Sequence, residues 1–265
     1  NTLTVRQVTV ESPQWRGPPL RVGIISDTHV AAPHMDVARV RGLVNRMNAE
    51  RPDVVVLLGD YAGGHEPAVV RAAPDTSEVL QGVEAFSGLR SPWGTWAVLG
   101  NHDSWFDEAA VAAALRRSNV GLLENEARRI DRPGGAFWVA GLADLHSKRS
   151  SPDIEAALGG TADDEPVILL THWPDPFADA PGRVALTLAG HTHCGQVVLP
   201  LVGRLVHASA ASGRWPCGLY DEDGRKLFVT GGVGVSILPV RFRAPPEIVV
   251  LTLRAPLDPP VRGPR

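Results

Sequence analysis

Short apolar runs rich in Val, Ile and Leu recur along this chain, and five of them end abruptly in polar residues. The runs cover residues 20–25, 54–58, 95–99, 167–170 and 185–189, and the residues that follow read SDTH, GD, GNHD, TH and GHTH. Runs of this length bounded by glycine or aspartate are typical of buried β-strands. The loops at the carboxyl ends of parallel strands converge at one edge of a sheet. The pattern therefore predicts an edge where polar side chains gather.

Helical patterns and further strands lie between and after these runs. Apolar residues recur at three- and four-residue spacing in 37–47 and 79–86, and 108–117 is rich in alanine, so we expect helices there. Further strands are expected at 2–10, 137–141, 227–230 and 248–253. This order predicts an α/β fold in which two mixed β-sheets pack face to face with helices outside. We expect one domain over residues 1–254 and a loose, proline-rich tail over 255–265.

Composition excludes several classes of protein. The 26 basic and 29 acidic residues give a net charge of −3, which offers no general attraction for duplex nucleic acid and disfavours a nuclease. No run of about eighteen apolar residues is present, so no transmembrane segment is expected. The two cysteines, Cys194 and Cys217, are expected to be buried thiols, and a disulfide between them in an oxidising compartment is the alternative. The chain begins at Asn1, which leaves open whether a signal or anchor was removed; the oligomeric state is also open.

The polar residues at the strand ends suit a metal centre when they are taken together. Each alone is an ordinary turn or cap residue, because Asp and Asn favour those positions. Crowded carboxylates and imidazoles, however, repel or desolvate one another unless a cation neutralises them. Seven nitrogen and oxygen donors are too many for one tetrahedral ion but suit two divalent ions, with Mn, Fe or Zn favoured over a thiolate zinc site. The seven are Asp27, His29, Asp60, Asn101, His172, His191 and His193.

The ordered motifs DTH, GD, GNHD, H and GHTH resemble those of the calcineurin-like metallophosphoesterase superfamily. Residues 218–253 look like the carboxyl-terminal part of a bacterial branch of cell-envelope-associated phosphoesterases, so the resemblance covers residues 20–253. It implies the four-layer metallophosphoesterase fold. It also favours a membrane-associated or exported location over a cytoplasmic one, and it is compatible with peripheral membrane association.

The resemblance assigns roles to the matching positions. Asp60 bridges two divalent ions, with Mn favoured, and a hydroxide held between the ions attacks phosphorus. His102 stabilises the transition state or protonates the leaving oxygen, and Asp103 orients it. One ion is held by Asp27, His29 and His193, and the other by Asn101, His172 and His191.

Substrate contacts are expected from two residues beside the motifs. Arg241 could grip a phosphate bidentately, and Trp173 follows the ligand His172. Four other histidines are expected at ordinary surface positions: His34, His65, His146 and His207. Because His34 and His65 follow metal-bearing loops, substrate contact is the alternative for these two. Gly63 departs from the charged residue that many relatives carry three positions after the bridging aspartate.

The predicted activity is hydrolysis of a phosphomonoester or phosphodiester by a dinuclear metal centre. The substrate is expected to be a phosphorylated small molecule or an envelope component. Two alternatives remain: a pyrophosphohydrolase acting on a nucleotide-linked lipid or envelope precursor, and a non-catalytic metal-binding scaffold of the same fold. An apolar groove beside the metals would favour the lipid-linked substrate, and retention of every matched ligand argues against the scaffold.

Overall fold

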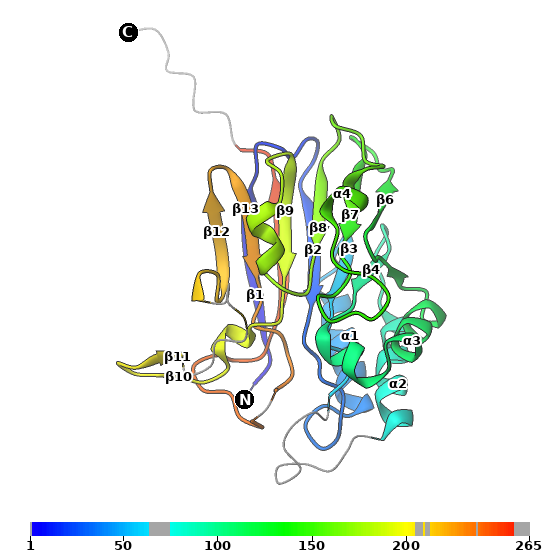
Figure 1. The fold of residues 1–265 in the computed structure, drawn as a ribbon, viewed down its shortest axis with the longest axis vertical. Coiled ribbons are helices and arrows are strands. Elements are labelled where there is room, and N and C mark those ends of the chain that lie inside the picture. Colours follow the sequence, from blue (N-terminus) through cyan, green and yellow to red (C-terminus); the bar gives the residue numbers. More distant parts are fainter. Residues whose placement is uncertain (1, 64–74, 205–208, 210–212, 237, 257–265) are drawn as a thin grey trace, which may run out of the picture.

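The computed structural model describes residues 2–63, 75–204, 209, 213–236 and 238–256, and its centre is a pair of six-stranded sheets (Figure 1). The first sheet has the order β1 (Thr4–Glu11), β14 (Glu247–Arg254), β2 (Leu20–Ile25), β3 (Val54–Leu58), β4 (Thr95–Val98) and β5 (Gly121–Leu122). The second has the order β12 (Gly218–Glu222), β13 (Arg225–Val229), β9 (Val184–Ala189), β8 (Val167–Leu170), β7 (Phe137–Gly141) and β6 (Glu126–Ile130). Both sheets mix parallel and antiparallel pairs, as predicted.

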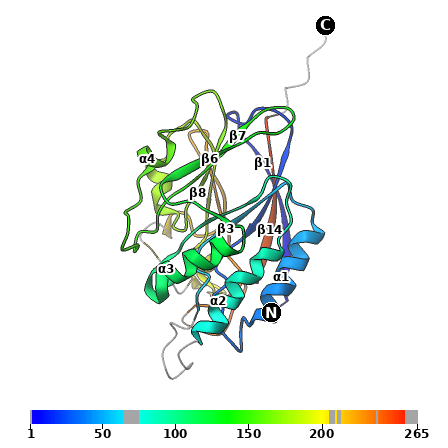
Figure 2. The ribbon, with the colours of Figure 1, turned by 90° about the vertical axis from the view of Figure 1, so that its right-hand side faces the viewer.

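Helices cover the outer faces of the two sheets. Figure 2 shows the helices α1 (Val37–Ala49), α2 (Thr76–Glu84) and α3 (Asn101–Arg117) side by side over the first sheet. The short helix α4 (Ile154–Leu158) and a 3-10 turn at Asp175–Asp179 pack against the second sheet. The result is the predicted four-layer arrangement of helices, sheet, sheet and helix. No helix in the described part of the chain is both long and apolar enough to cross a membrane.

The core forms because adjacent side chains of a strand point to opposite faces of its sheet. In β3, Val54, Val56 and Leu58 enter the core between the two sheets. Val55 and Leu57 enter a second core beneath the helices. All of these side chains are fully buried, which explains why the strand reads as a continuous apolar run rather than an alternating one.

The elements that the sequence did not predict are short or polar. The edge strand β6 reads EARRI, with Arg128 and Arg129 exposed, and charges are tolerated there because one side of an edge strand faces solvent. The helix α3 begins at Asn101 rather than at the expected residue 108, so the GNHD motif is its first turn. The Asp103 carboxylate accepts the Gly100 backbone N–H at 2.9 Å and stabilises this start. Most of the predicted tail, 257–265, lies outside the described residues.

The two ends of the described chain leave the first sheet in opposite directions. The strand β1 pairs in parallel with β14, and β14 runs antiparallel to β2. Both β1 and β14 therefore begin at the end of the sheet where β2 finishes, and both finish at the far end (Figure 1).

The depth of this core gives a matched pair of stability predictions. Leu251 in β14 is fully buried between the sheets, so Leu251→Ala should lower the free energy of unfolding by about 2–5 kcal/mol through lost burial and a residual cavity. Leu219 in β12 is 44% exposed, and Leu219→Ala should cost less than about 0.5 kcal/mol. Urea denaturation measures both, and equal losses would contradict the described packing.

Candidate metal centre

Loops from both sheets bring six of the predicted ligand side chains together, and the seventh, Asn101, is buried at the start of α3 after β4. Asp27 and His29 follow β2, Asp60 follows β3, and Asn101 begins α3 just after β4. His172 follows β8, and His191 and His193 follow β9. None of these residues is more than 7% exposed. The candidate metal centre is this set of seven residues.

Three of them form a first group of donor atoms. The Nε2 atoms of His29 and His193 lie 3.0 Å apart, and His193 Nε2 lies 3.6 Å from Asp27 Oδ1. Asp27, His29 and His193 each offer a ligand atom within 4.8 Å of the others.

A second group lies beside the first and is linked to it by Asp60. Asp60 Oδ2 is 3.6 Å from His29 Nε2 and 3.3 Å from His172 Nε2. His172 Nε2 is also 3.2 Å from His191 Nδ1. The Oδ2 atom of Asp60 thus lies between an imidazole of each group, which is the position that a shared ligand requires.

The donor atoms fit divalent cations. Donors about 2.0–2.2 Å from a common ion lie about 3.0–3.6 Å from one another, which matches the separations above. The Asn101 Oδ1 atom is buried and has no hydrogen-bond partner in the described structure, although buried carbonyl oxygens are nearly always satisfied. A cation would satisfy it. The donors are nitrogen and oxygen atoms, the set that suits Mn, Fe or Zn.

Electrostatics also favours positive charge at the centre. Burial lowers the pKa of His29 and of His193 well below its ordinary value, so both rings are neutral and have a lone pair for a metal. Burial alone would lower the pKa of His172, but the charges of Asp60, Asp27 and Asp144, together with the hydrogen bond to Asp60, outweigh it and raise this pKa to about 10. The Asp60 carboxyl has a pKa well below its usual value, since neighbouring imidazoles oppose its desolvation. The ionised Asp60 carboxylate therefore stabilises a positive charge beside it, which either a proton on His172 or a cation can supply.

Left-handed backbone conformations aim the ligands inward. The φ angles are 53° at Asp27, 46° at His29, 54° at Asp60, 67° at His191 and 49° at His193. Such angles are uncommon for residues other than glycine and cost energy, and they cluster at functional sites. Five of the seven candidate ligands have such angles, which indicates that the loops adopt these conformations in order to place ligand side chains at the centre.

Two motif glycines leave room for ligand carboxylates. A Cβ atom at Gly190 would lie 2.1 Å from Ser26 Oγ and 2.6 Å from Asp27 Oδ2. A Cβ atom at Gly100 would lie 2.3 Å from Asp60 Oδ1. The glycines of the GHTH and GNHD motifs are therefore required by close packing against Asp27 and Asp60.

Comparison with known proteins identifies the family. The model of the calcineurin-like phosphoesterase family matches residues 20–195, about two thirds of the chain and the segment that holds all seven candidate ligands. The chain belongs to this family. The predicted superfamily is therefore confirmed.

Relatives of this calcineurin-like phosphoesterase occur in bacteria and animals. The uncharacterised metallophosphoesterase YkuE of Bacillus subtilis is 30% identical over 237 residues, which cover 87% of this chain and 77% of that protein. A bovine transmembrane protein with a metallophosphoesterase domain is 32% identical over 268 residues, which cover 93% of this chain and 56% of that protein. The NAD nucleotidase of Haemophilus influenzae shares the fold, with a TM-score of 0.51 at 14% identity over 84% of this chain and 46% of that one. This chain therefore spans between about half and three quarters of these relatives.

The two predicted catalytic residues lie at the start of α3. His102 is 9% exposed, its ring centroid is 4.5 Å from that of His29, and its backbone N–H donates to Asp60 Oδ1 at 2.9 Å. His102, His29 and Asp60 also form a group of potential ligands within 4.8 Å. Asp103 was expected to orient His102, but the hydrogen bonds described for its carboxylate come from the backbone N–H groups of Tyr61, Ala62 and Gly100. Through these hydrogen bonds Asp103 stabilises the loops that contain Asp60 and Asn101.

Arg241 and Trp173, the predicted substrate contacts, both lie directly behind ligands. The Arg241 guanidinium is 5% exposed, donates to the Gly231, Gly234 and Ala244 carbonyl oxygens, and has Nη2 3.0 Å from His193 Nδ1. The Trp173 ring centroid is 3.5 Å from that of His191. Both geometries fix the orientation of a histidine ring.

Sequence reasoning missed two supporting residues. Asp144 is buried, accepts the Trp173 indole N–H at 2.7 Å and thereby supports the ring behind His191. Gln196 donates to the Ser236 and Leu238 carbonyl oxygens and accepts the Ser236 backbone N–H. Gln196 lies only three residues after His193, the last residue of the GHTH motif, and this proximity could have identified it as a supporting residue. Asp144 follows an apolar strand in the same way as the predicted ligands do.

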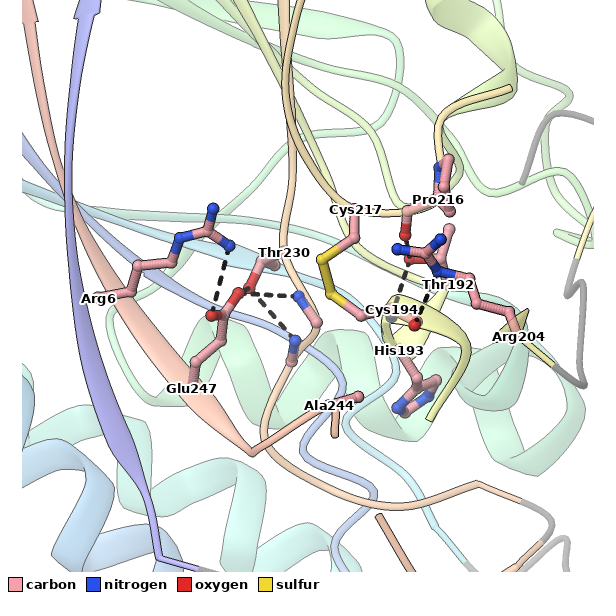
Figure 3. Close-up of a disulfide and its surroundings, with 12 residues drawn as sticks. Arg6, Thr192, His193, Cys194, Arg204, Pro216, Cys217, Thr230, Ala244 and Glu247 are labelled. Atoms are coloured by element: carbon pink, nitrogen blue, oxygen red, sulfur yellow. Dashed lines mark hydrogen bonds and ion pairs between the residues drawn. A yellow bond between two sulfur atoms is a disulfide. The ribbon is translucent and has the colours of Figure 1, made fainter. Parts of the chain in front are cut away.

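Cys194 and Cys217 form a disulfide, which corrects the expectation of two thiols (Figure 3). Their Cα atoms lie 4.9 Å apart, within the range that a disulfide spans. The fold brings them together because Cys194 follows His193 and Cys217 directly precedes β12. Sequence separation could not reveal this proximity.

The structure describes two of the four histidines outside the motifs, and they differ in exposure. His146 is exposed, as predicted, and its ring lies 5.5 Å from that of Trp105. His34 is half-buried and lines a pocket beside the centre, which differs from an ordinary surface position. His65 and His207 lie outside the described residues. Gly63 occupies the position at which many relatives carry a charged residue. A Cβ atom there would lie 2.5 Å from the His29 carbonyl oxygen, so this backbone has no room for a larger side chain.

The close approach at Gly190 generates a prediction about metal affinity. Gly190→Ala should weaken Mn²⁺ binding by about 10–100-fold, because the new methyl group must displace Ser26 and the Asp27 carboxylate. The control is Gly160→Ala, since a Cβ atom there meets nothing within 4 Å. Calorimetric titration of metal-free protein with Mn²⁺ measures both variants. Equal affinities in the two would contradict the packing described for Asp27.

Proposed function

We propose that this chain is a dinuclear metal-dependent phosphoesterase that hydrolyses phosphomonoester or phosphodiester bonds. The observation that carries the proposal is the convergence of six buried Asp and His side chains, with the Asp60 carboxylate between two groups of imidazoles and the unsatisfied Asn101 Oδ1 buried at the start of α3. Membership of the calcineurin-like phosphoesterase family supports the reaction class.

In this proposal each metal position has its own ligands and Asp60 belongs to both. When bound, the two divalent ions supply Lewis acidity toward phosphoryl oxygens and lower the pKa of a water. Mn²⁺ is favoured because carboxylate and amide oxygens share the ligand set with imidazoles. Asp27, His29 and His193 would hold one ion, and Asn101, His172 and His191 the other.

His102 is proposed to donate a proton to the leaving oxygen. Its ring lies beside that of His29, and its backbone is fixed by the bond to Asp60 Oδ1. Asp103, Arg241 and Trp173 are proposed as positioning residues: Asp103 holds the loops, while Arg241 and Trp173 hold the rings of His193 and His191. These roles would keep the ligands in place while the ester bond breaks.

The alternatives can be weighed against particular observations. A scaffold without catalysis would be expected to lose ligands, whereas every matched ligand is present here. A nucleotide-linked lipid or envelope precursor is favoured by a partly apolar pocket that shares His29 with the centre. The disulfide supports an oxidising location, such as the exported or membrane-associated one, over the cytoplasm.

A two-substrate assay tests the proposed activity. Purified protein reconstituted with Mn²⁺ should hydrolyse p-nitrophenyl phosphate, bis-p-nitrophenyl phosphate or both, and a chelator should abolish the activity until Mn²⁺ is restored. Elemental analysis of the same sample should approach two divalent ions per chain. A metal-loaded protein that hydrolyses neither ester nor a broad panel of natural phosphoesters would favour the scaffold.

Removing the shared carboxylate should disable both metal positions. Asp60→Ala should abolish turnover and lower the metal content, because Asp60 Oδ2 faces imidazoles of both groups. Asp163→Ala is a suitable control, since this carboxylate is 96% exposed and lies before β8, the strand whose opposite end leads to His172. Elemental analysis and the p-nitrophenyl phosphate assay provide the readouts. Near-normal activity in Asp60→Ala would refute the shared-ligand assignment.

Removing His102 should separate proton transfer from metal binding. His102→Ala should retain both ions and slow turnover by about 10²–10⁴-fold, the usual cost of losing a general acid. Asp163→Ala, which removes a side chain that is 96% exposed, should leave turnover near the wild-type value. If His102→Ala instead loses an ion, His102 is itself a ligand, as its distance to His29 and Asp60 permits.

A further inference from the structure

A pocket of about 580 Å³ lies next to the candidate metal centre, and the two share residues. His29 and Arg241 line the pocket, while His29 Nε2 faces the other ligands and Arg241 contacts His193. The pocket size falls within the range of about 300–1,000 Å³ that is usual for small-molecule sites. The pocket therefore adjoins the centre on the side of His29.

Polar and apolar surface contribute about equally to the pocket, and eight of the residues that line it have apolar side chains. They come from three distant segments: the start of the described chain, the α1 region, and the loop before β14. They include Leu3, Met35, Leu43, Val233, Val240 and Pro246. His34 and Arg39 add polar groups on the α1 side, and the Arg39 guanidinium donates to the His34 carbonyl oxygen. The pocket is thus lined by apolar side chains and, on the α1 side, by the basic residues His34 and Arg39.

Exposed apolar residues flank the pocket-lining Val240 along the chain. Leu238, Val240 and Phe242 are 46%, 50% and 45% exposed and belong to one short segment. This segment pairs with the start of a hairpin made of β10 (Val198–Leu199) and β11 (Gly203–Arg204), through a bridge between Val197 and Phe242. The hairpin projects from the body (Figure 1), and its turn residues Leu201 and Val202 are 109% and 69% exposed. Clustered exposed apolar side chains mark binding sites more often than isolated ones do.

We infer that this pocket receives the apolar tail of an amphiphilic phosphoester whose phosphoryl group lies at the metal centre. The inference rests on the proposed function and names its substrate class. The phosphoryl end matches the seven polar ligands, the tail matches Leu3, Leu43 and Val240, and the shared His29 joins the two regions. Tail burial supplies binding energy for the reacting end, since each buried methylene strengthens binding about fourfold.

Alkyl phosphonates test the inference without depending on catalysis, because hydrolysis of a phosphoester does not cleave their P–C bond. Octylphosphonate and ethylphosphonate are titrated into the Mn²⁺-loaded protein by calorimetry, with the octyl compound kept monomeric. Octylphosphonate should bind more tightly by a factor on the order of 10² if about half of its additional methylenes are buried. Equal affinities would overturn the inference.

Substitutions in the pocket test whether the alkyl chain binds there. Gly42 lines the pocket on α1, and a Cβ atom there meets nothing within 4 Å, so Gly42→Trp can fill space without a backbone clash. Gly42→Trp should reduce the octyl-to-ethyl affinity ratio about tenfold or more. The control is Gly160→Trp, which adds the same side chain in open space away from the pocket and should retain the wild-type ratio. Val240→Asp, at a half-exposed position, should also reduce the ratio, because a tail would desolvate the new carboxylate.

The outcomes separate this inference from the proposed function. If small esters are hydrolysed and ethylphosphonate binds, but chain length has no effect or Gly42→Trp retains the full octyl advantage, the pocket assignment fails alone. If neither phosphonate binds the Mn²⁺-loaded protein, both the pocket assignment and the proposed metal chemistry fail. An octyl advantage that falls in Gly42→Trp and Val240→Asp but not in Gly160→Trp supports the inference.

Discussion

The structure depends on how two carboxylates and a group of imidazoles are accommodated away from water. Asp27 and Asp60 are buried among five histidine rings, and an isolated buried charge would cost more free energy than a domain of this size can spare. Each carboxylate is therefore bound by the protein as well as facing the centre. Asp60 accepts the His102 backbone N–H with Oδ1 while Oδ2 faces His29 and His172. Asp27 similarly accepts the His191 backbone N–H. The remaining negative charge faces inward, where divalent ions could neutralise it.

This arrangement requires a rigid support, because the ligand loops are held in unfavourable backbone conformations. The support comes from strands that are fully buried on both faces, such as β3 and β9, whose side chains leave no freedom for the loops to relax. It also comes from main-chain contacts to the ligands: the Leu58 carbonyl oxygen accepts His172 Nδ1–H at 2.7 Å and leaves Nε2 directed at Asp60. Two sheets are needed because the ligands come from the carboxyl ends of strands in both.

Much of this could be predicted from the sequence, since each buried strand is a continuous apolar run and each ligand follows such a run directly. Residues 20–25 and 54–58 match β2 and β3 without adjustment. The edge strand β6 was not predicted because only one of its five residues, Ile130, is buried, so its sequence lacks an apolar run. The disulfide and the pocket escaped it for another reason: each joins segments that only the fold brings together, as Leu3, Leu43 and Val240 illustrate. The motif reading likewise placed Arg241 and Trp173 near the site but could not show that they support ligands.

The parallel pairing of β1 with β14 has a practical consequence. Leu3, just before β1, lines the pocket, whereas β14 finishes at the opposite end of the first sheet. A purification tag or surface linker joined before Thr2 would therefore emerge next to the pocket and could obstruct it. The same linker placed after residue 256 would leave from the far end, so attachment there should orient an immobilised molecule with its pocket facing the solution.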